Sequence, residues 1–375
     1  TTSATAGSLE NAIKDTTISG KAMIGYNYVD NAGATANQTE YDFDMTMNTK
    51  VNDTITFTSG IQADHTVANR DETTNTNGSQ SITLTKLYFT AKTDVATVMV
   101  GKQKQPTPFL DDERGDGVVA LVPAGPVTVA AGHITGLLAD RSITAVAAIG
   151  SFGPVNASVW GVDVTSGTAD AYVDSTDGVD GIAGTADDGV VDMPAAFIDG
   201  ISGYSLNLNG TFGPAKVDFT HTSLEQDASG SEDETLTKLI VSGKVANVNL
   251  VAGYGMTNDT SDDDRNHGVD LTSDNDAKTN FRLDQLVLDD HNDADAILLG
   301  ASMTFGQTTV GASYLMVGID ATTADAKKDA TELDLTVAYA MSKNFSITGL
   351  YSTSSIDDNT AGTQEIGRAS CRERV

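Results

Sequence analysis

The sequence lacks the long apolar runs that form membrane-spanning helices. Within its 375 residues no stretch approaches the roughly 20 consecutive apolar residues that such a helix needs. This shortage does not make the protein soluble, because a membrane barrel carries its apolar side chains at every second residue and its overall hydropathy looks ordinary. The missing runs therefore disfavour a helical membrane protein and leave a barrel open.

Basic residues are also scarce. The chain has 22 Lys and Arg against 52 Asp and Glu, a formal net charge of −30. Because so acidic a protein repels phosphates, the composition argues against a nucleic-acid partner. The same acidity fits either attraction of cations or the solvation of exposed loops.

The single cysteine, Cys371, lies in an Arg-rich segment that differs from the Thr- and Asp-rich chain before it. This segment is similar to the translation of a sequencing-library adapter, so we expect residues 366–375 to be a non-native tail outside the fold. The rest of the chain then has no cysteine, as suits an envelope protein that folds without disulfides.

Alternation of apolar and polar residues with period two runs through most of the chain, whereas helix-period patterns are nearly absent. Residues 332–341 place Leu333, Leu335 and Val337 between polar or small residues, and residues 204–212 alternate in the same way. Successive side chains of a strand point to opposite faces. The pattern therefore predicts strands with one apolar face and one mostly polar face.

The connections between these strands separate a membrane barrel from a β-sandwich. Every second connection is a tight turn such as Phe212–Pro214, and the others include long acidic stretches such as Thr165–Phe197. Short turns at one end and long loops at the other are typical of outer-membrane barrels, and a sandwich gives no reason for this segregation. We predict an all-β fold, a transmembrane antiparallel β-barrel over residues 17–364, after an N-terminal periplasmic segment at residues 1–16. Its short turns would be periplasmic and its long acidic loops extracellular.

Seventeen strands can be recognised, but bacterial barrels of this kind close with an even number. The last strand would follow Gln364, where the adapter-like segment begins. We therefore expect the closing strand to be missing.

Short motifs occur in a characteristic order near the start, in the first third and near the end of the chain. They are Leu9–Asp15 before Ile18–Gly20, Leu87–Thr90 before Asp94–Thr97 and Val100–Gln103, and Tyr339–Ser346 before Leu350–Ser352. In these motifs the sequence resembles the major outer-membrane porin family of Campylobacter and related epsilonproteobacteria. The resemblance implies an 18-stranded barrel, a homotrimer and one loop folded into the pore as a constriction. The aromatic C-terminal residue of that family is absent here.

The function predicted from these features is that of an outer-membrane porin in a Gram-negative cell. It would be a passive channel for small hydrophilic solutes and ions, in contact with outer-membrane lipid and lipopolysaccharide. Acidic residues outnumber basic ones on the expected lumen face, so we predict a preference for cations. The protein is not expected to be an enzyme or to require a cofactor, since its five histidines are dispersed and no nucleophile elbow or phosphate loop is present.

The expected constriction is the connection at residues 103–117. We predict that Asp111, Asp112, Glu113 and Asp116 present a negative edge there, with Arg114 as a local partner; an ordinary solvated loop is the alternative. By alternation, the predicted lining of the pore consists of Lys21, Asp42, Asp44, Asp64, Lys86, Lys102, Lys216, Asp218, Lys238, Glu332 and Asp334. Aromatic residues near the strand ends, Trp160 among them, are interpreted as girdles at the membrane surfaces.

One Gly- and Asp-rich connection has the composition of a calcium site, although it lacks the EF-hand spacing. The candidate ligands are Asp177, Asp180, Asp187, Asp188 and Asp192. Two other functions stay open beside the porin. They are a calcium-stabilised, β-rich surface adhesin or layer protein and a substrate-specific outer-membrane channel. Solubility without detergent would favour the adhesin, and a basic ladder along the lumen would favour the specific channel.

Overall fold

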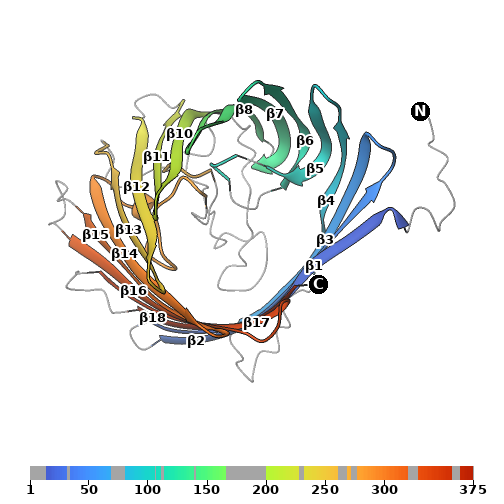
Figure 1. The fold of residues 1–375 in the computed structure, drawn as a ribbon. Coiled ribbons are helices and arrows are strands. Elements are labelled where there is room, and N and C mark those ends of the chain that lie inside the picture. Colours follow the sequence, from blue (N-terminus) through green and yellow to red (C-terminus); the bar gives the residue numbers. More distant parts are fainter. Residues whose placement is uncertain are drawn as a thin grey trace, which may run out of the picture.

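The computed structural model describes residues 14–31, 34–68, 81–105, 107–110, 114–138, 141–165, 200–227, 232–260, 268–271, 277–319, 328–356 and 364–374. These residues form an all-β fold whose strands belong to a single antiparallel sheet, with one short 3-10 helix, η2 (Leu288–Asp290). Figure 1 shows the strands arranged around the centre of the view. The described residues contain no helix that is long and apolar enough to cross a membrane.

The strands follow one another along the chain with similar lengths. They are β1 (Thr16–Asn31), β2 (Ala34–Lys50), β3 (Ile55–Ala68), β4 (Ser81–Lys92), β5 (Thr97–Lys104), β6 (Arg114–Ala124), β7 (Val127–Leu138), β8 (Arg141–Phe152), β9 (Val155–Val164), β10 (Ile201–Phe212), β11 (Ala215–Gln226), β12 (Glu234–Val245), β13 (Val248–Thr257), β14 (Ala294–Phe305), β15 (Thr308–Ile319), β16 (Lys328–Ala340), β17 (Phe345–Ile356) and β18 (Gln364–Arg374).

Each strand pairs with the strands before and after it in the chain. β1 pairs with β2 and also with β18, in a register that runs from Lys21 opposite Arg374 to Asn31 opposite Gln364. β18 also pairs with β17. The expectation of a missing last strand therefore differs from the structure, in which the Arg-rich segment occupies that place. Strand pairing uses backbone groups that every non-proline residue carries, so a segment of unusual composition can still pair.

The connections differ in length according to their parity, as the sequence pattern predicts. The turns after β10 and β14 are Gly213–Pro214 and Gly306–Gln307, and both glycines have a φ of 61°, a conformation that favours glycine. The connections after β9 and β13 are long, at residues 165–200 and 258–293. Two connections depart from the pattern, since β1–β2 and β7–β8 are also short.

The two faces of the sheet differ in exposure. We call the face that carries Ile143, Leu236 and Leu315 the inner face, because chain segments from two connections pack on it. The opposite, outer face carries large apolar side chains that are exposed, among them Leu299 and Tyr314, which the register places opposite each other. An exposed apolar face of this extent is unusual for a monomeric soluble protein.

The inner face is polar along some strands and apolar along others. On β6 to β9 it carries Val119, Ala130, Ala145 and Val162, all buried. The expectation of a polar stripe on every strand is therefore wrong for this part of the sheet. The reason is that a connecting segment covers these side chains, so they face protein instead of water.

Candidate functional site

Two connections send a segment onto the inner face of the sheet. The first inward segment is Thr107–Leu110, from the connection between β5 and β6. The second inward segment comprises residues 268–271 and 277–293, from the connection between β13 and β14. The two segments meet where the backbone N–H of Leu271 donates to the backbone oxygen of Phe109 at 3.0 Å. This junction is the candidate functional site, because the part of the inner face that the first inward segment covers adjoins there the part that the second inward segment covers.

The first inward segment is held by apolar contacts. Phe109 is fully buried, and with Leu110 it belongs to a cluster that includes Ile143, Val164 and Leu224 of the sheet. Trp160 packs against this cluster. On β9 it is paired with Ala147 and Ser205 of the inner face, so the interpretation of Trp160 as a girdle residue on the outer face is wrong. An indole suits both a membrane surface and a protein interior, because it has an apolar body and one polar N–H group. The alternation of residues in a strand does not show which face of the sheet a connection covers.

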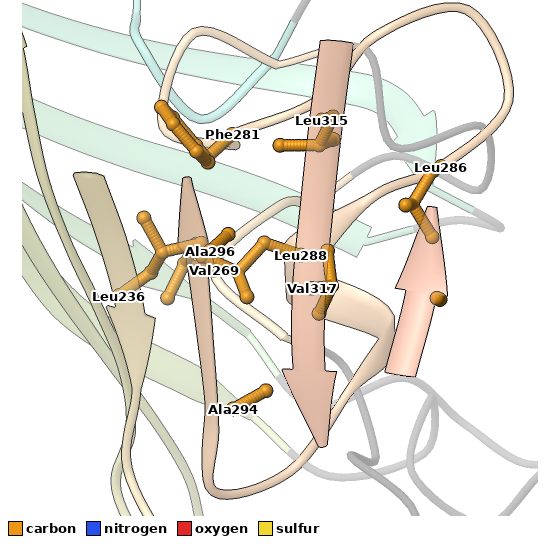
Figure 2. Close-up of a cluster of buried hydrophobic side chains, with 10 residues drawn as sticks. Leu236, Val269, Phe281, Leu286, Leu288, Ala294, Ala296, Leu315 and Val317 are labelled. Atoms are coloured by element: carbon orange, nitrogen blue, oxygen red, sulfur yellow. The ribbon is translucent and has the colours of Figure 1, made fainter. Parts of the chain in front are cut away.

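The second inward segment combines apolar packing with polar anchors. Its apolar side chains Phe281, Leu286 and Leu288 form one buried cluster with Leu236 and Leu315 of the sheet, which Figure 2 draws. Burying three large side chains contributes about 1.5–3 kcal/mol for each one. The sequence carries a signal for this segment, since an apolar run interrupts an otherwise acidic connection.

Two glycines of β13 make room for this packing. A Cβ atom added at Gly255 would lie 2.7 Å from Leu288 Cδ2 and 2.9 Å from Phe281 Cδ1, and one added at Gly253 would lie 3.0 Å from the Phe281 ring. Both glycines are on the inner face, opposite Lys238 and Ile240 of β12. Phe281 therefore packs directly on the backbone of the strand.

Glu332 of β16 is the principal polar anchor. Its side chain is 0% exposed. Its carboxylate accepts the backbone N–H groups of Asp284 at 3.0 Å, Gln285 at 2.9 Å and Leu286 at 2.6 Å, and also the hydroxyl of Ser352 at 2.8 Å. Three successive backbone donors thus converge on one wall carboxylate, which fixes the turn before η2.

β12 supplies two further anchors. The Lys238 ammonium group donates to the backbone oxygens of Lys278 and Asn280, at 2.5 Å each. The Glu234 carboxylate accepts the backbone N–H of Gly268 at 2.5 Å. Within the segment itself, Asp289 accepts the backbone N–H of Val269 at 2.7 Å. Charged groups thereby satisfy backbone donors and acceptors that would otherwise be buried without partners.

The predicted constriction residues are only partly within the described structure. Asp111, Asp112 and Glu113 lie outside the described residues. Arg114 and Asp116 begin β6. Asp116 is exposed and pairs with Lys102 in register.

Lys102 is in turn opposite Leu87, which is an exposed apolar residue of the outer face. The register therefore places Lys102 and Asp116 on the outer face and not on the inner face. The alternation within β5 is unbroken, and Lys102 shares its face of the strand with Val98 and with the exposed Val100.

The other residues predicted to line the pore belong to the inner face by register. Lys21 and Asp42 form an ion pair at 2.7 Å, and Lys86 Nζ donates to the Thr46 hydroxyl at 2.8 Å. Asp64 lies in β3 opposite Asp42, but its side chain is outside the described residues. The remaining inner-face positions are Asp44, Lys216, Asp218, Lys238, Glu332 and Asp334.

Lys238 and Glu332 differ from the prediction in one respect. They are 8% and 0% exposed, because the second inward segment covers them. Alternation correctly identifies their face of the sheet, but it cannot show that a distant connection folds over them.

The described residues offer no group of three or more His, Cys, Asp or Glu side chains that could hold a metal ion. The predicted calcium ligands, Asp177 to Asp192, lie outside the described residues. One titratable group in the second inward segment is perturbed, since burial lowers the pKa of His291 and the neighbouring Asp290 carboxylate opposes this effect. The segment therefore favours a neutral imidazole.

Comparison with known proteins gives a family and a set of structural neighbours. The sequence model for Gram-negative porins matches residues 1–359. OccK3 (OpdO) of Pseudomonas aeruginosa has a TM-score of 0.72 and 12% identity, with 98% of this chain and 97% of that chain covered. OpdL of the same organism has a TM-score of 0.73 and 11% identity, with 96% and 99% covered. OccAB1 of Acinetobacter baumannii has a TM-score of 0.72 and 12% identity, with 96% and 97% covered.

No curated protein matches the sequence. At these identities the structural neighbours establish the fold only. The family match is to Gram-negative porins in general, so the narrower resemblance to the Campylobacter-type family stays a prediction.

Proposed function

The chain belongs to the family of Gram-negative porins, and on that premise we propose that it is a passive diffusion channel for small hydrophilic solutes and ions. It is an outer-membrane protein and a transport channel, not an enzyme. The observation that carries the proposal is the contrast between the two faces of the sheet. Large apolar side chains are exposed on the outer face, whereas chain segments and paired charges occupy the inner face.

The proposed architecture is an 18-stranded transmembrane barrel. A sheet in hydrocarbon must leave no unpaired edge, because no water is present to satisfy its backbone groups. Pairing of β1 with β18 supports such closure. A barrel of this strand number has a lumen too wide for wall side chains to fill, so the lumen would hold water. The short turns would face the periplasm and the long connections the exterior.

We place the constriction at the two inward segments together. In this proposal the first inward segment narrows the lumen from β8 and β9, and the second narrows it from β12 to β16. This revises the initial expectation of a constriction at residues 103–117 alone. The support is the hydrogen bond between Leu271 and Phe109, which joins the segments.

Cation preference and a homotrimeric assembly are parts of the same proposal. The formal charge of −30 supports cation preference, because a negative potential raises the local concentration of cations. The exposed apolar outer face supports contact with lipid and with neighbouring subunits.

The decisive experiment is planar-bilayer recording with the purified full chain. We expect stepwise conductance in KCl and, in a salt gradient, a reversal potential of the sign produced by cation flow. Anion-directed reversal would refute the selectivity but leave the channel standing. A protein that stays soluble without detergent and shows no conductance would refute the channel and support the adhesin alternative.

A further inference from the structure

Three basic residues lie together on the outer face of β5 and β6. Lys102 and Lys104 share one face of β5 with the exposed Val100, and the register pairs Lys104 with Arg114 of β6. Lys104 is exposed, whereas Lys102 and Arg114 are half-buried. From the rise along a strand and the spacing between strands, their Cα atoms lie within about 9 Å of one another. We call these three residues the basic cluster.

The basic cluster differs in charge from the rest of the outer face. In the strands that the structure describes, register and alternation assign every other lysine and arginine to the inner face, Lys86 and Lys216 among them. At the same end of other strands the outer face carries exposed acidic residues instead, namely Asp163, Glu225 and Asp295. Positive charge is therefore concentrated at one place on the outer surface of a chain whose net charge is −30.

The charge of the basic cluster suits a phosphate group. Asp116 is exposed and lies opposite Lys102 in register, and its carboxylate offsets one of the three positive charges. The described residues at this place therefore remain net positive. An arginine offers a planar fork of N–H donors to phosphate oxygens, and a lysine binds phosphate as a compact point charge.

The basic cluster lies where the outer face changes from apolar to polar. Toward the short turns the same face carries Leu87, Val100 and Val118, which are all exposed. At the level of the cluster, the register continues from Asp116 through Thr135 of β7 to Ser142 of β8. Lysine and arginine side chains at such a boundary lay their apolar stems along hydrocarbon and hold their charges at the level of the lipid headgroups.

We propose that the basic cluster binds a phosphate group of a lipid in the outer leaflet of the outer membrane. The acyl chains of this lipid would lie against the apolar surface formed by Leu87, Val100 and Val118. Lipid A, the phosphorylated anchor of lipopolysaccharide, combines phosphates and acyl chains in this way. The proposal rests on the proposed channel function, which places the long connections at the cell exterior, and it assigns a binding site to the lipid.

The test is native mass spectrometry of the purified full chain in detergent, titrated with diphosphoryl lipid A. The cluster variant removes the three positive charges through the changes Lys102→Gln, Lys104→Gln and Arg114→Gln. The matched control removes three exposed lysines near the short turns through the changes Lys50→Gln, Lys92→Gln and Lys244→Gln. Normal KCl conductance in phosphatidylcholine bilayers shows that each variant has folded.

The cluster variant should bind diphosphoryl lipid A roughly a hundredfold more weakly than the parent. Each basic residue beside an anionic lipid group strengthens binding about five-fold, and three such residues are lost. The control variant should bind lipid A as the parent does. Equal affinity of the parent and the cluster variant would overturn the proposal, and so would an equal loss of affinity in the control variant.

Two ligand series test the lipid chemistry in the parent without any substitution. Affinity should fall from diphosphoryl to monophosphoryl lipid A, and high KCl should weaken binding, because both changes reduce the attraction between charges. Equal affinity for a lipid A analogue that lacks phosphate would overturn the proposal. Inorganic phosphate that displaces lipid A at equal concentration would show a site for a soluble anion, which would also overturn it.

The KCl recordings separate this proposal from the function on which it rests. A parent chain without KCl conductance would refute the channel function. A parent chain with normal conductance whose lipid A binding does not depend on the basic cluster would refute the lipid site alone.

Discussion

Replacing Glu332 by alanine is expected to release the second inward segment from the wall. In the folded protein the Glu332 carboxylate accepts three successive backbone N–H groups, from Asp284 to Leu286, and the Ser352 hydroxyl. Alanine supplies no acceptor. The three N–H groups must then either stay buried without partners or turn toward water together with the residues that carry them.

The magnitude follows from the number of hydrogen bonds lost. A hydrogen bond to a charged group contributes about 1.5–3 kcal/mol, and an unsatisfied buried donor costs about 1–3 kcal/mol. Since the released segment can recover hydration, we take about 3 kcal/mol for the whole anchor. This corresponds to roughly a hundredfold rise in the population of the detached segment.

Hydrogen–deuterium exchange measures the detachment directly. For exchange that occurs through detachment of the segment, we expect the amides of residues 284–286 to exchange roughly a hundredfold faster in Glu332→Ala than in the parent. Single-channel conductance should rise in the same variant, because the proposed constriction would lose one side.

The matched control is Glu225→Ala, which removes an exposed carboxylate on β11. It should leave both exchange and conductance as in the parent. Unchanged protection of residues 284–286 in a folded Glu332→Ala channel would refute the reasoning, because it would show that apolar packing alone holds the segment.

Three other perturbations test separate parts of the structure. Lys238→Met should lower stability by about 2–3 kcal/mol in thermal unfolding followed by circular dichroism, because two backbone oxygens lose a charged donor; Lys216→Met, at an exposed site, is the control. Burial lowers the pKa of His291 in the folded protein, so the neutral imidazole stabilises the packing of the second inward segment. This stabilisation is complete above the ordinary histidine pKa of about 6.5, and it declines as the pH falls from 6.5 through the lower pKa of the folded state. Exchange at residues 284–286 should therefore be faster at pH 5.5 than the intrinsic pH dependence of amide exchange predicts. His291→Asn should abolish this excess exchange. A chain that stops before Gln364 leaves one edge each of β1 and β17 unpaired; we expect it to lose heat-modifiable migration on a gel, and retention would show that β18 is dispensable.

The strands were predictable from local chemistry. Leu333, Leu335 and Val337 alternate with polar or small residues, and the structure places them in β16 with their side chains exposed on the outer face. The turn at Gly306 was equally readable, since glycine suits its positive φ. Such features depend on residues that are adjacent in sequence.

The inward segments were not predictable in the same way. On β7 both faces carry apolar residues, so Ala130 and Ile134 could not be separated from Val129 as the inner set without knowing that Gln105 and Thr107 lie beside them. The anchoring role of Glu332 depends on backbone donors that are 46 to 48 residues away along the chain. Contacts at such separations follow from how a long connection folds, which alternation within a strand does not encode.

The absence of side chains at Gly253 and Gly255 of β13 couples the evolution of that strand to the evolution of a distant connection. Any mutation that gives position 255 a side chain collides with Leu288 and Phe281, so descendants of this gene should keep the glycine or shrink a loop residue in compensation. Across related sequences, size at position 255 and size at positions 281 and 288 should therefore vary inversely.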